Sequence, residues 1–114
     1  MISYQTVFAM HQRLEELNFC RRGVRDNNLL LSAIGGQQWY QDIFKQYIHV
    51  AYSINAFHIF FDGNKRTCFL VLKELNKFRY YFDDSLLSDE VLNLANNSGM
   101  SKDEFYNRVY NCLL

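Results

Sequence analysis

The segment HIFFDGNKRT, residues 58–67, gathers the side chains whose types and spacing could do chemistry. Histidine has an ordinary pKa near ~6.5 and can take a proton from an attacking hydroxyl, so His58 is a candidate general base. Asp62 follows one turn-length later and offers a carboxylate. Phe60, between them, can lie beneath the loop and fix the direction in which both side chains point.

The next residues predict an anion site. Gly63 lets the backbone turn close to a ligand, and the amides from Asn64 onward project from the start of a helix, where phosphate binds well. Lys65 and Arg66 add full positive charge, and a planar guanidinium can hold two phosphate oxygens, so the pair suits a di- or triphosphate. A carboxylate beside phosphates requires a cation between them, which makes Asp62 a candidate Mg²⁺ ligand.

The residues alone leave a structural interpretation of this segment open. Asp-Gly-Asn is ordinary turn chemistry, and Lys-Arg often begins a solvated helix. A lone histidine before a turn is also often structural.

Helical patterns precede the segment. The apolar spacing predicts a first helix with Ser3 as its N-cap and a short second helix that Asp26 caps and Gly35 and Gly36 stop. A largely buried helix is predicted from about Tyr40 to Phe57. It ends where the polar segment begins.

Helical patterns also follow it. Residues 67–78 are apolar almost all round at first, as expected of a core helix, and residues 78–85 are aromatic and can be extended. A further helix is predicted from Ser88 to near Gly99, and Ser101 to Glu104 matches a capping box before the last one. The fold class predicted is all-α, one domain over residues 1–114, with about six helices around a buried central helix and the polar loop at its N-terminus.

Composition restricts the setting. Twelve Lys and Arg balance twelve Asp and Glu, so no global basic field favours nucleic acid. Cys20, Cys68 and Cys112 are widely spaced and show neither a disulfide framework nor a zinc pattern, which favours a reduced, cytoplasmic setting. No window reaches the ~18 apolar residues of a membrane span, and the first residues lack the features of a signal peptide, so a soluble, unprocessed protein is expected.

Residues 58–66 resemble the signature of the Fic/Doc superfamily, His-x-Phe-x-Asp/Glu-Gly/Ala-Asn-Gly/Lys-Arg, at every fixed position. Residues 23–34, GVRDNNLLLSAI, resemble a Gly-Ile-Arg-Asp-x-x-Leu-Leu-x-Ser-Ala-Leu stretch of the Doc branch, and the N-terminal helix that carries His11 has a counterpart there. The resemblance covers nearly the whole chain. Two positions are less typical: Ile59 stands where proline is common, and Phe61 is a bulky apolar residue at a variable position.

The resemblance implies an all-helical fold and a reaction in which a target hydroxyl attacks ATP in the presence of Mg²⁺. It also implies a role for each polar residue of the segment: His58 as base, Asp62 as metal ligand, Gly63 and Asn64 as part of an anion hole, and Lys65 and Arg66 as phosphate contacts.

Lys65 bears on the type of transfer. Adenylylating Fic members usually have glycine there, whereas the Doc toxin has lysine and phosphorylates a threonine of the elongation factor that delivers aminoacyl-tRNA, which arrests translation and growth. Lysine therefore favours a Doc-like protein kinase. Adenylyl transfer and a catalytically inactive, partner-binding domain remain alternatives.

Many Fic proteins inhibit themselves through a Ser/Thr-x-x-x-Glu-Gly/Asn helix. The residues four positions before each glutamate of this chain are His11, Gln12, Leu70, Leu86 and Met100. None is serine or threonine, so inhibition is expected from a separate antitoxin. The resemblance thus implies a toxin–antitoxin pair in the cytoplasm of a bacterium, encoded by the bacterium or by a phage.

Other residues have less specific predictions. Gln37, Gln38 and Trp39 fall where the family places a flap that aligns the target peptide, with packing of Trp39 in the core as the alternative. The arginines at 21, 22 and 25 are expected in a salt-bridged, capped helix start rather than on nucleic acid. His11 and His49 are expected to be surface or hydrogen-bonded structural residues, and Cys68 to lie in the core.

Overall fold

The computed structural model describes residues 1–97 and 99–114, and these residues form an all-α bundle without a β-strand. The predicted fold class is confirmed. In chain order the elements are α1 (Tyr4–Glu16), α2 (Asn27–Gly36), the 3₁₀ helix η1 (Gln37–Trp39), α3 (Ile43–Ala56), α4 (Asn64–Lys73), the 3₁₀ helix η2 (Glu74–Phe78), α5 (Asp84–Asn96) and α6 (Lys102–Tyr110).

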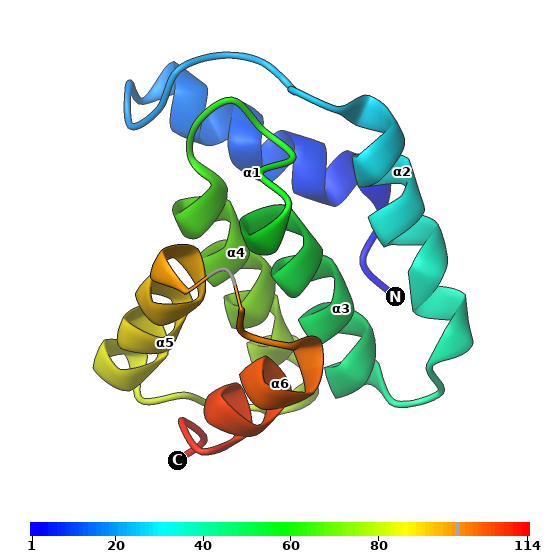
Figure 1. Ribbon diagram of the computed structural model, residues 1–114, viewed down its shortest axis with the longest axis vertical. Helices are drawn as coiled ribbons and strands as arrows, with labels where there is room; N and C mark the ends of the chain where they lie inside the picture. Colours follow the sequence, from blue (N-terminus) through cyan, green and yellow to red (C-terminus); the bar gives the residue numbers. More distant parts are fainter. Residues whose placement is uncertain (98) are drawn as a thin grey trace.

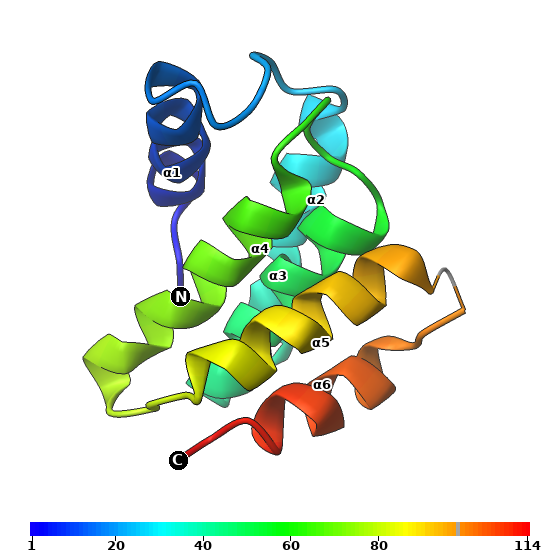
Figure 2. The ribbon, with the colours of Figure 1, turned by 90° about the vertical axis from the view of Figure 1, so that its left-hand side faces the viewer.

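The helices α3 and α4 form the centre of the bundle (Figure 1). They pack on each other, α3 also contacts α2, α5 and α6, and α4 also contacts α1 and α5. Figure 2 shows α1 at one end of the bundle, while α5 and α6 cross the other side. Because neighbours cover both central helices, the polar loop that joins them is held at a fixed place, at the top of Figure 1.

Side-chain caps explain where the helices begin. Ser3, Asp26 and Ser101 accept hydrogen bonds from the amides of Thr6, Leu29 and Glu104, which confirms the three predicted N-caps. The fifth helix begins at Asp84 because Asp83 caps it, through the amide of Leu86. The predicted start at Ser88 is therefore wrong by about one turn.

The conformation at the C-terminal end of α2 and the start of α3 also differ from the prediction. Asp42 caps α3, so this helix begins at Ile43 rather than near Tyr40. The second helix ends at Gly36, as predicted, but Gly36 is helical, with a φ of −65°, rather than left-handed. A Cβ on Gly36 would overlap the imidazole of His49, so glycine at this position permits the close approach of α2 to α3.

The aromatic segment after η2 is extended where it meets the C-terminus. Phe82 forms an antiparallel bridge with Leu113, and the amide of Asp83 donates to the carbonyl oxygen of Cys112 at 2.8 Å. The predicted extended segment, residues 78–85, is confirmed only in its middle, because Phe78 ends η2 and Asp84 and Ser85 begin α5. The last residues are thereby tied to the body of the bundle.

All three cysteines carry free thiols, and Cys68 lies in the core, as predicted. No helix in the described part of the chain combines the length and the apolar character that a membrane crossing requires.

Candidate functional site

A polar cavity of about 520 Å³ opens at the loop between α3 and α4. It contains every polar residue of the segment 58–66, and Phe60, which does not line it, is fully buried. The lining residues are Phe19, Asn55, His58, Phe61, Asp62, Gly63, Asn64, Lys65, Arg66, Ala95 and Asn96.

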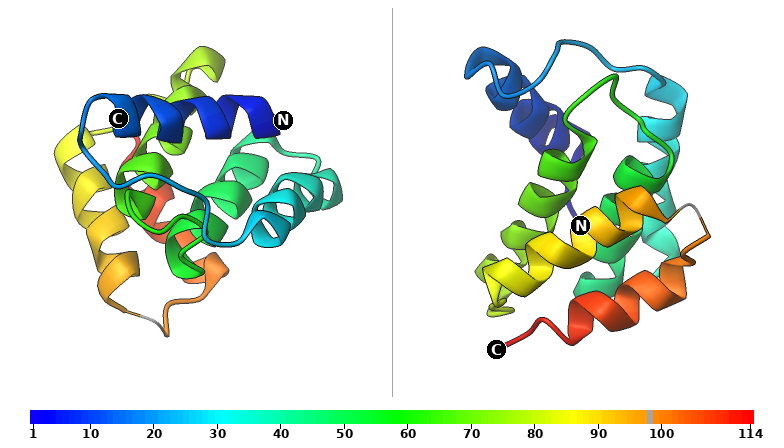
Figure 3. Two further views of the ribbon diagram at one scale, coloured as in Figure 1. Left: turned by 90° about the horizontal axis from the view of Figure 1, so that it is seen from above. Right: turned by 60° about the vertical axis from the view of Figure 1, so that its left-hand side comes forward.

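The first half of the loop pairs with the segment between α1 and α2. Val24 forms an antiparallel bridge with Phe60, and the amides of Arg25 and Asp26 both donate to the carbonyl oxygen of Ile59, at 2.8 and 3.1 Å. Figure 3, seen from above, shows the two segments side by side. The two stretches that resembled one family in the sequence are thus direct partners, and residues 23–26 act as the scaffold of the loop.

His58 lies at the C-terminal end of α3 in an uncommon backbone conformation. Its φ is +49°, in the left-handed region that non-glycine residues seldom adopt. The guanidinium of Arg25 donates to the carbonyl oxygen of His58 at 2.6 Å and to that of Phe57 at 2.7 Å. This two-pronged contact fixes the backbone that carries the exposed imidazole of His58.

The arginines near Asp26 do not form the ion pairs that were expected. Arg25 bonds backbone carbonyl oxygens, and within residues 1–97 and 99–114 neither it nor Arg21 nor Arg22 pairs with a carboxylate. Their expected salt bridges are therefore wrong, whereas the predicted Asp26 cap is present.

Asp62 is exposed, and its carboxylate bonds the loop before α2. Its Oδ2 accepts from the amide of Arg21 at 2.8 Å. This bond has the largest effect on the pKa of the Asp62 carboxyl, which lies below its ordinary value; desolvation opposes it, and the Gly63 amide adds a weaker lowering effect. An exposed aspartate is already ionised at neutral pH, and the second oxygen of this carboxylate can still bind a cation.

The N-terminus of α4 faces the same cavity. Its N-cap, Gly63, has a φ of +78° and no side chain, and the first i→i−4 bond runs from the amide of Thr67 to the carbonyl oxygen of Gly63. The three preceding amides, of Asn64, Lys65 and Arg66, have no helical acceptor and can bind an anion.

Lys65 and Arg66 are exposed at the rim of the cavity. The guanidinium of Arg66 lies over the ring of Phe19, 4.8 Å from its centroid. This cation–π contact orients Arg66 toward the site. Phe19 was missed in the sequence because its partner is distant along the chain and no motif links the two.

Asn64 uses its side chain inside the loop. It is buried and bonds both the amide and the carbonyl oxygen of Phe60, so any contact of Asn64 with phosphate must come from its backbone amide. Phe60 lies beneath the loop, as expected, and its positioning role stays a prediction.

His11 reaches the loop from α1. Its Nε2 lies 2.8 Å from the carbonyl oxygen of Asp62, its Nδ1 lies 3.1 Å from Oε2 of Glu15, and its ring stacks on Phe60 at 3.8 Å. The same Glu15 oxygen accepts from the amide of Gly23 at 2.8 Å. The prediction of a hydrogen-bonded structural histidine is confirmed. Its carboxylate partner, Glu15, was missed, although residues at i and i+4 of a helix lie on the same face and could have been predicted to pair.

The predicted flap is not at the cavity. Gln37 is fully buried and bonds the backbone of Ile2 through both ends of its amide, so its assignment to a target-docking surface is wrong. Gln38 and Trp39 are exposed, the latter by 80%, which excludes core packing of Trp39. However, η1 precedes α3, whereas the loop follows this helix, whose 14 residues span about 21 Å.

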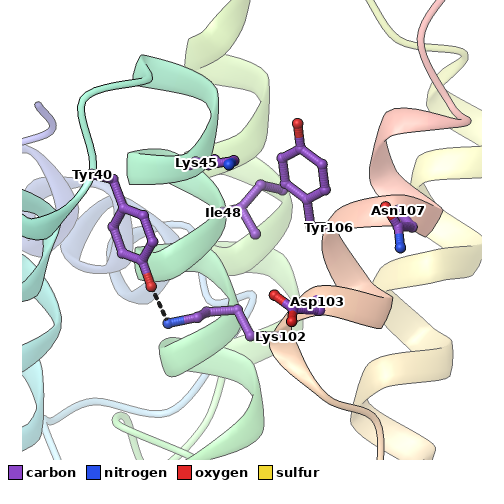
Figure 4. A pocket seen from close by; sticks show the side chains of 7 residues that line it. All are labelled: Tyr40, Lys45, Ile48, Lys102, Asp103, Tyr106 and Asn107. Carbon is purple, nitrogen blue, oxygen red and sulfur yellow. Dashed lines mark hydrogen bonds between the residues drawn. The ribbon is translucent and has the colours of Figure 1, made fainter.

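A second cavity, of about 340 Å³, lies between α3 and α6 (Figure 4). There Lys102 donates to Tyr40 Oη at 2.5 Å and to His49 Nδ1 at 3.0 Å, and Lys45 lies over the ring of Tyr106. Burial, and then the charge of Lys102, lower the pKa of His49, so the neutral imidazole is the acceptor. The cations of this cavity already have partners, and His49 is structural, as predicted.

The donor set for a metal ion is small. Among residues 1–97 and 99–114, no three His, Cys, Asp or Glu side chains cluster as ligands. A single carboxylate still fits Mg²⁺ that arrives with phosphates, because Mg²⁺ commonly uses one or two carboxylates together with phosphate oxygens. Asp62 meets that requirement.

One comparison with known proteins identifies the family of the chain. The family model described as Fic/DOC family matches residues 1–75, more than half of the chain. The matched part contains α1 to α4, and therefore the loop, its scaffold and His11. The comparison with curated proteins found no match.

Proposed function

Because the chain belongs to the Fic/DOC family, we propose that it is a nucleotide-dependent transferase that phosphorylates a Ser/Thr hydroxyl of a bacterial protein. One observation carries this proposal: a single cavity contains His58, Asp62 and the cationic N-terminus of α4. These are a proton acceptor, a carboxylate and an anion site within reach of one substrate.

The transfer would proceed by in-line displacement. The target hydroxyl gives its proton to the imidazole of His58 while its oxygen bonds the γ-phosphorus of ATP. The bond from that phosphorus to the β–γ bridging oxygen breaks, and ADP leaves with the electron pair. The amides at the start of α4, with Lys65 and Arg66, stabilise the charge on the phosphoryl oxygens.

Asp62 would hold Mg²⁺ together with the phosphates. When bound, the ion neutralises charge on the phosphate oxygens. The amide of Arg21 holds one oxygen of the Asp62 carboxylate and lowers its pKa, which leaves the other oxygen for the ion.

We place the nucleoside in a groove beside the loop. An apolar groove of about 450 Å³ between α1, α4 and α5 shares Phe19, Lys65 and Arg66 with the polar cavity. Its other lining residues are Leu14, Phe69, Leu70, Ser88, Val91 and Leu92. A purine ring bound there would leave its phosphates at the N-terminus of α4.

The biological role we propose is that of a Doc-like toxin, with the translation elongation factor as the leading target. Lysine at 65 supports phosphoryl rather than adenylyl transfer. The sequence has no Ser/Thr four residues before a glutamate, which supports inhibition by a separate antitoxin.

Isotope labelling tests the reaction. The protein is incubated with Mg²⁺ and ATP labelled at the γ or the α phosphorus, with purified elongation factor or bacterial lysate as target. We expect label from the γ position only, and none with His58→Ala or Asp62→Ala. Label from the α position only would indicate adenylyl transfer instead. Growth arrest that survives both substitutions would indicate a partner-binding domain and contradict an enzyme.

A further inference from the structure

We propose that His11 is a positioning residue that keeps the amide of Gly63 directed into the anion-binding cavity. The inference rests on the nucleotide site proposed above, because it assigns a function to the backbone of that site. His11 itself would touch no substrate, since its side chain lies beneath the loop and is 3% exposed.

The partners of His11 define its hydrogen bond to the loop. A carbonyl oxygen can only accept, so the nitrogen 2.8 Å from the oxygen of Asp62, Nε2, must donate. The other nitrogen, Nδ1, faces the carboxylate of Glu15, and Cys20 Sγ lies 3.6 Å from Nε2. Glu15 lies on α1, as His11 does, and Cys20 lies in the loop that follows α1.

Because the peptide between Asp62 and Gly63 is planar, the direction of the Asp62 carbonyl group determines the direction of the Gly63 N–H group. No peptide bond in the described chain is cis, and in a trans peptide the C=O and N–H groups point in opposite directions. Because His11 holds the carbonyl oxygen of Asp62 toward the interior, the N–H of Gly63 must point away from His11, on the side of the cavity that Gly63 lines.

Two further contacts fix the arrangement. The imidazole is within 6° of parallel to the ring of Phe60, which sets its plane. Gly63 lies directly against Cys20, so closely that an added Cβ would be 2.8 Å from Sγ. A flip of the peptide between Asp62 and Gly63 would break the bond to His11 and turn a carbonyl oxygen toward the bound phosphates, where it would repel them.

The experiment compares two substitutions at one position. His11→Phe keeps a flat ring for stacking on Phe60 but removes the donor, whereas His11→Gln keeps a donor. We expect His11→Phe to bind MgATP about tenfold or more weakly by calorimetry, and His11→Gln to recover most of the affinity. His49→Gln, which alters a histidine of α3 outside the loop, is the control and should bind as the wild type does.

The NMR resonance of the Gly63 amide distinguishes positioning from general stability. It should shift in ligand-free His11→Phe and stay in place in His49→Gln. A folded His11→Phe protein with wild-type affinity and an unmoved Gly63 resonance would overturn the proposal. So would an unprotonated His11 Nε2 in the ¹⁵N spectrum of the wild type, a measurement that needs no variant to fold. If the wild type binds no MgATP, the proposed function fails, while these ligand-free spectra still decide the role of His11.

Discussion

The side-chain amide of Asn64 forms hydrogen bonds with both backbone polar groups of Phe60. Its Oδ1 accepts from the Phe60 amide at 2.9 Å, and its Nδ2 donates to the Phe60 carbonyl oxygen at 2.9 Å. Asparagine fits this place because it has one acceptor and one donor at the end of a short side chain. The pair joins the first residue of α4 to the buried middle of the loop and fixes the position of the helix N-terminus relative to the loop.

Asn64→Ala should destabilise the protein by about 2 kcal/mol or more, because it leaves two buried backbone groups of Phe60 without partners. Urea unfolding measures the change. Asn93→Ala is the matched control: Asn93 bonds Glu90 at the exposed surface of α5, and its loss should change the stability by less than about 0.5 kcal/mol. Equal effects of the two substitutions would contradict the role assigned to Asn64.

Gly63→Ala should destabilise the fold by about 1–3 kcal/mol, because its φ of +78° disfavours any side chain and the new Cβ would lie 2.8 Å from Cys20 Sγ. Gly35→Ala is the internal control, since a Cβ there meets nothing within 4 Å and the position is helical. It should stabilise the fold by about 0.5–1 kcal/mol. Thermal unfolding of both variants checks the opposite signs.

The sequence predicted which side chains lie together where one short segment contains them, and their roles stay predictions. A cavity gathers His58, Asp62 and the start of α4 because they lie on one turn, and spacing alone implies their proximity. Local capping likewise predicted the starts of α1, α2 and α6.

The partners of polar side chains that are distant along the chain were not predicted from the sequence. Arg25 was expected to pair with an acid, yet it bonds carbonyl oxygens of residues more than thirty positions away, and no local pattern encodes that choice. Gln37 was assigned to a docking surface from its place in the family, whereas its side chain is buried and bonds the backbone of Ile2, which is buried just before α1. In both cases tertiary hydrogen bonding decided the role of a polar side chain.

Arg25→Lys should lower the rate of phosphate transfer about tenfold, because an ammonium cannot replace the planar fork that holds the carbonyl oxygens of Phe57 and His58 together. The rate is measured with γ-labelled ATP, beside a circular dichroism spectrum that monitors folding. Arg22→Lys, a conservative change at an exposed position of the same segment, should leave the rate unchanged. Wild-type activity of Arg25→Lys would show that the His58 backbone needs no such clamp.

The stability of the wild type should fall as the pH drops below about 6.5 through a contribution from His49. Burial and Lys102 lower the pKa of this imidazole from 6.5 in the folded state, so the unfolded chain binds the proton first and the stabilisation is lost progressively down to the folded-state pKa. His49→Gln removes the titrating group, and the stability difference between the two proteins isolates it from the other histidines. Urea unfolding from pH 7.5 to 5 should therefore give a steeper loss for the wild type, and parallel curves would contradict the lowered pKa.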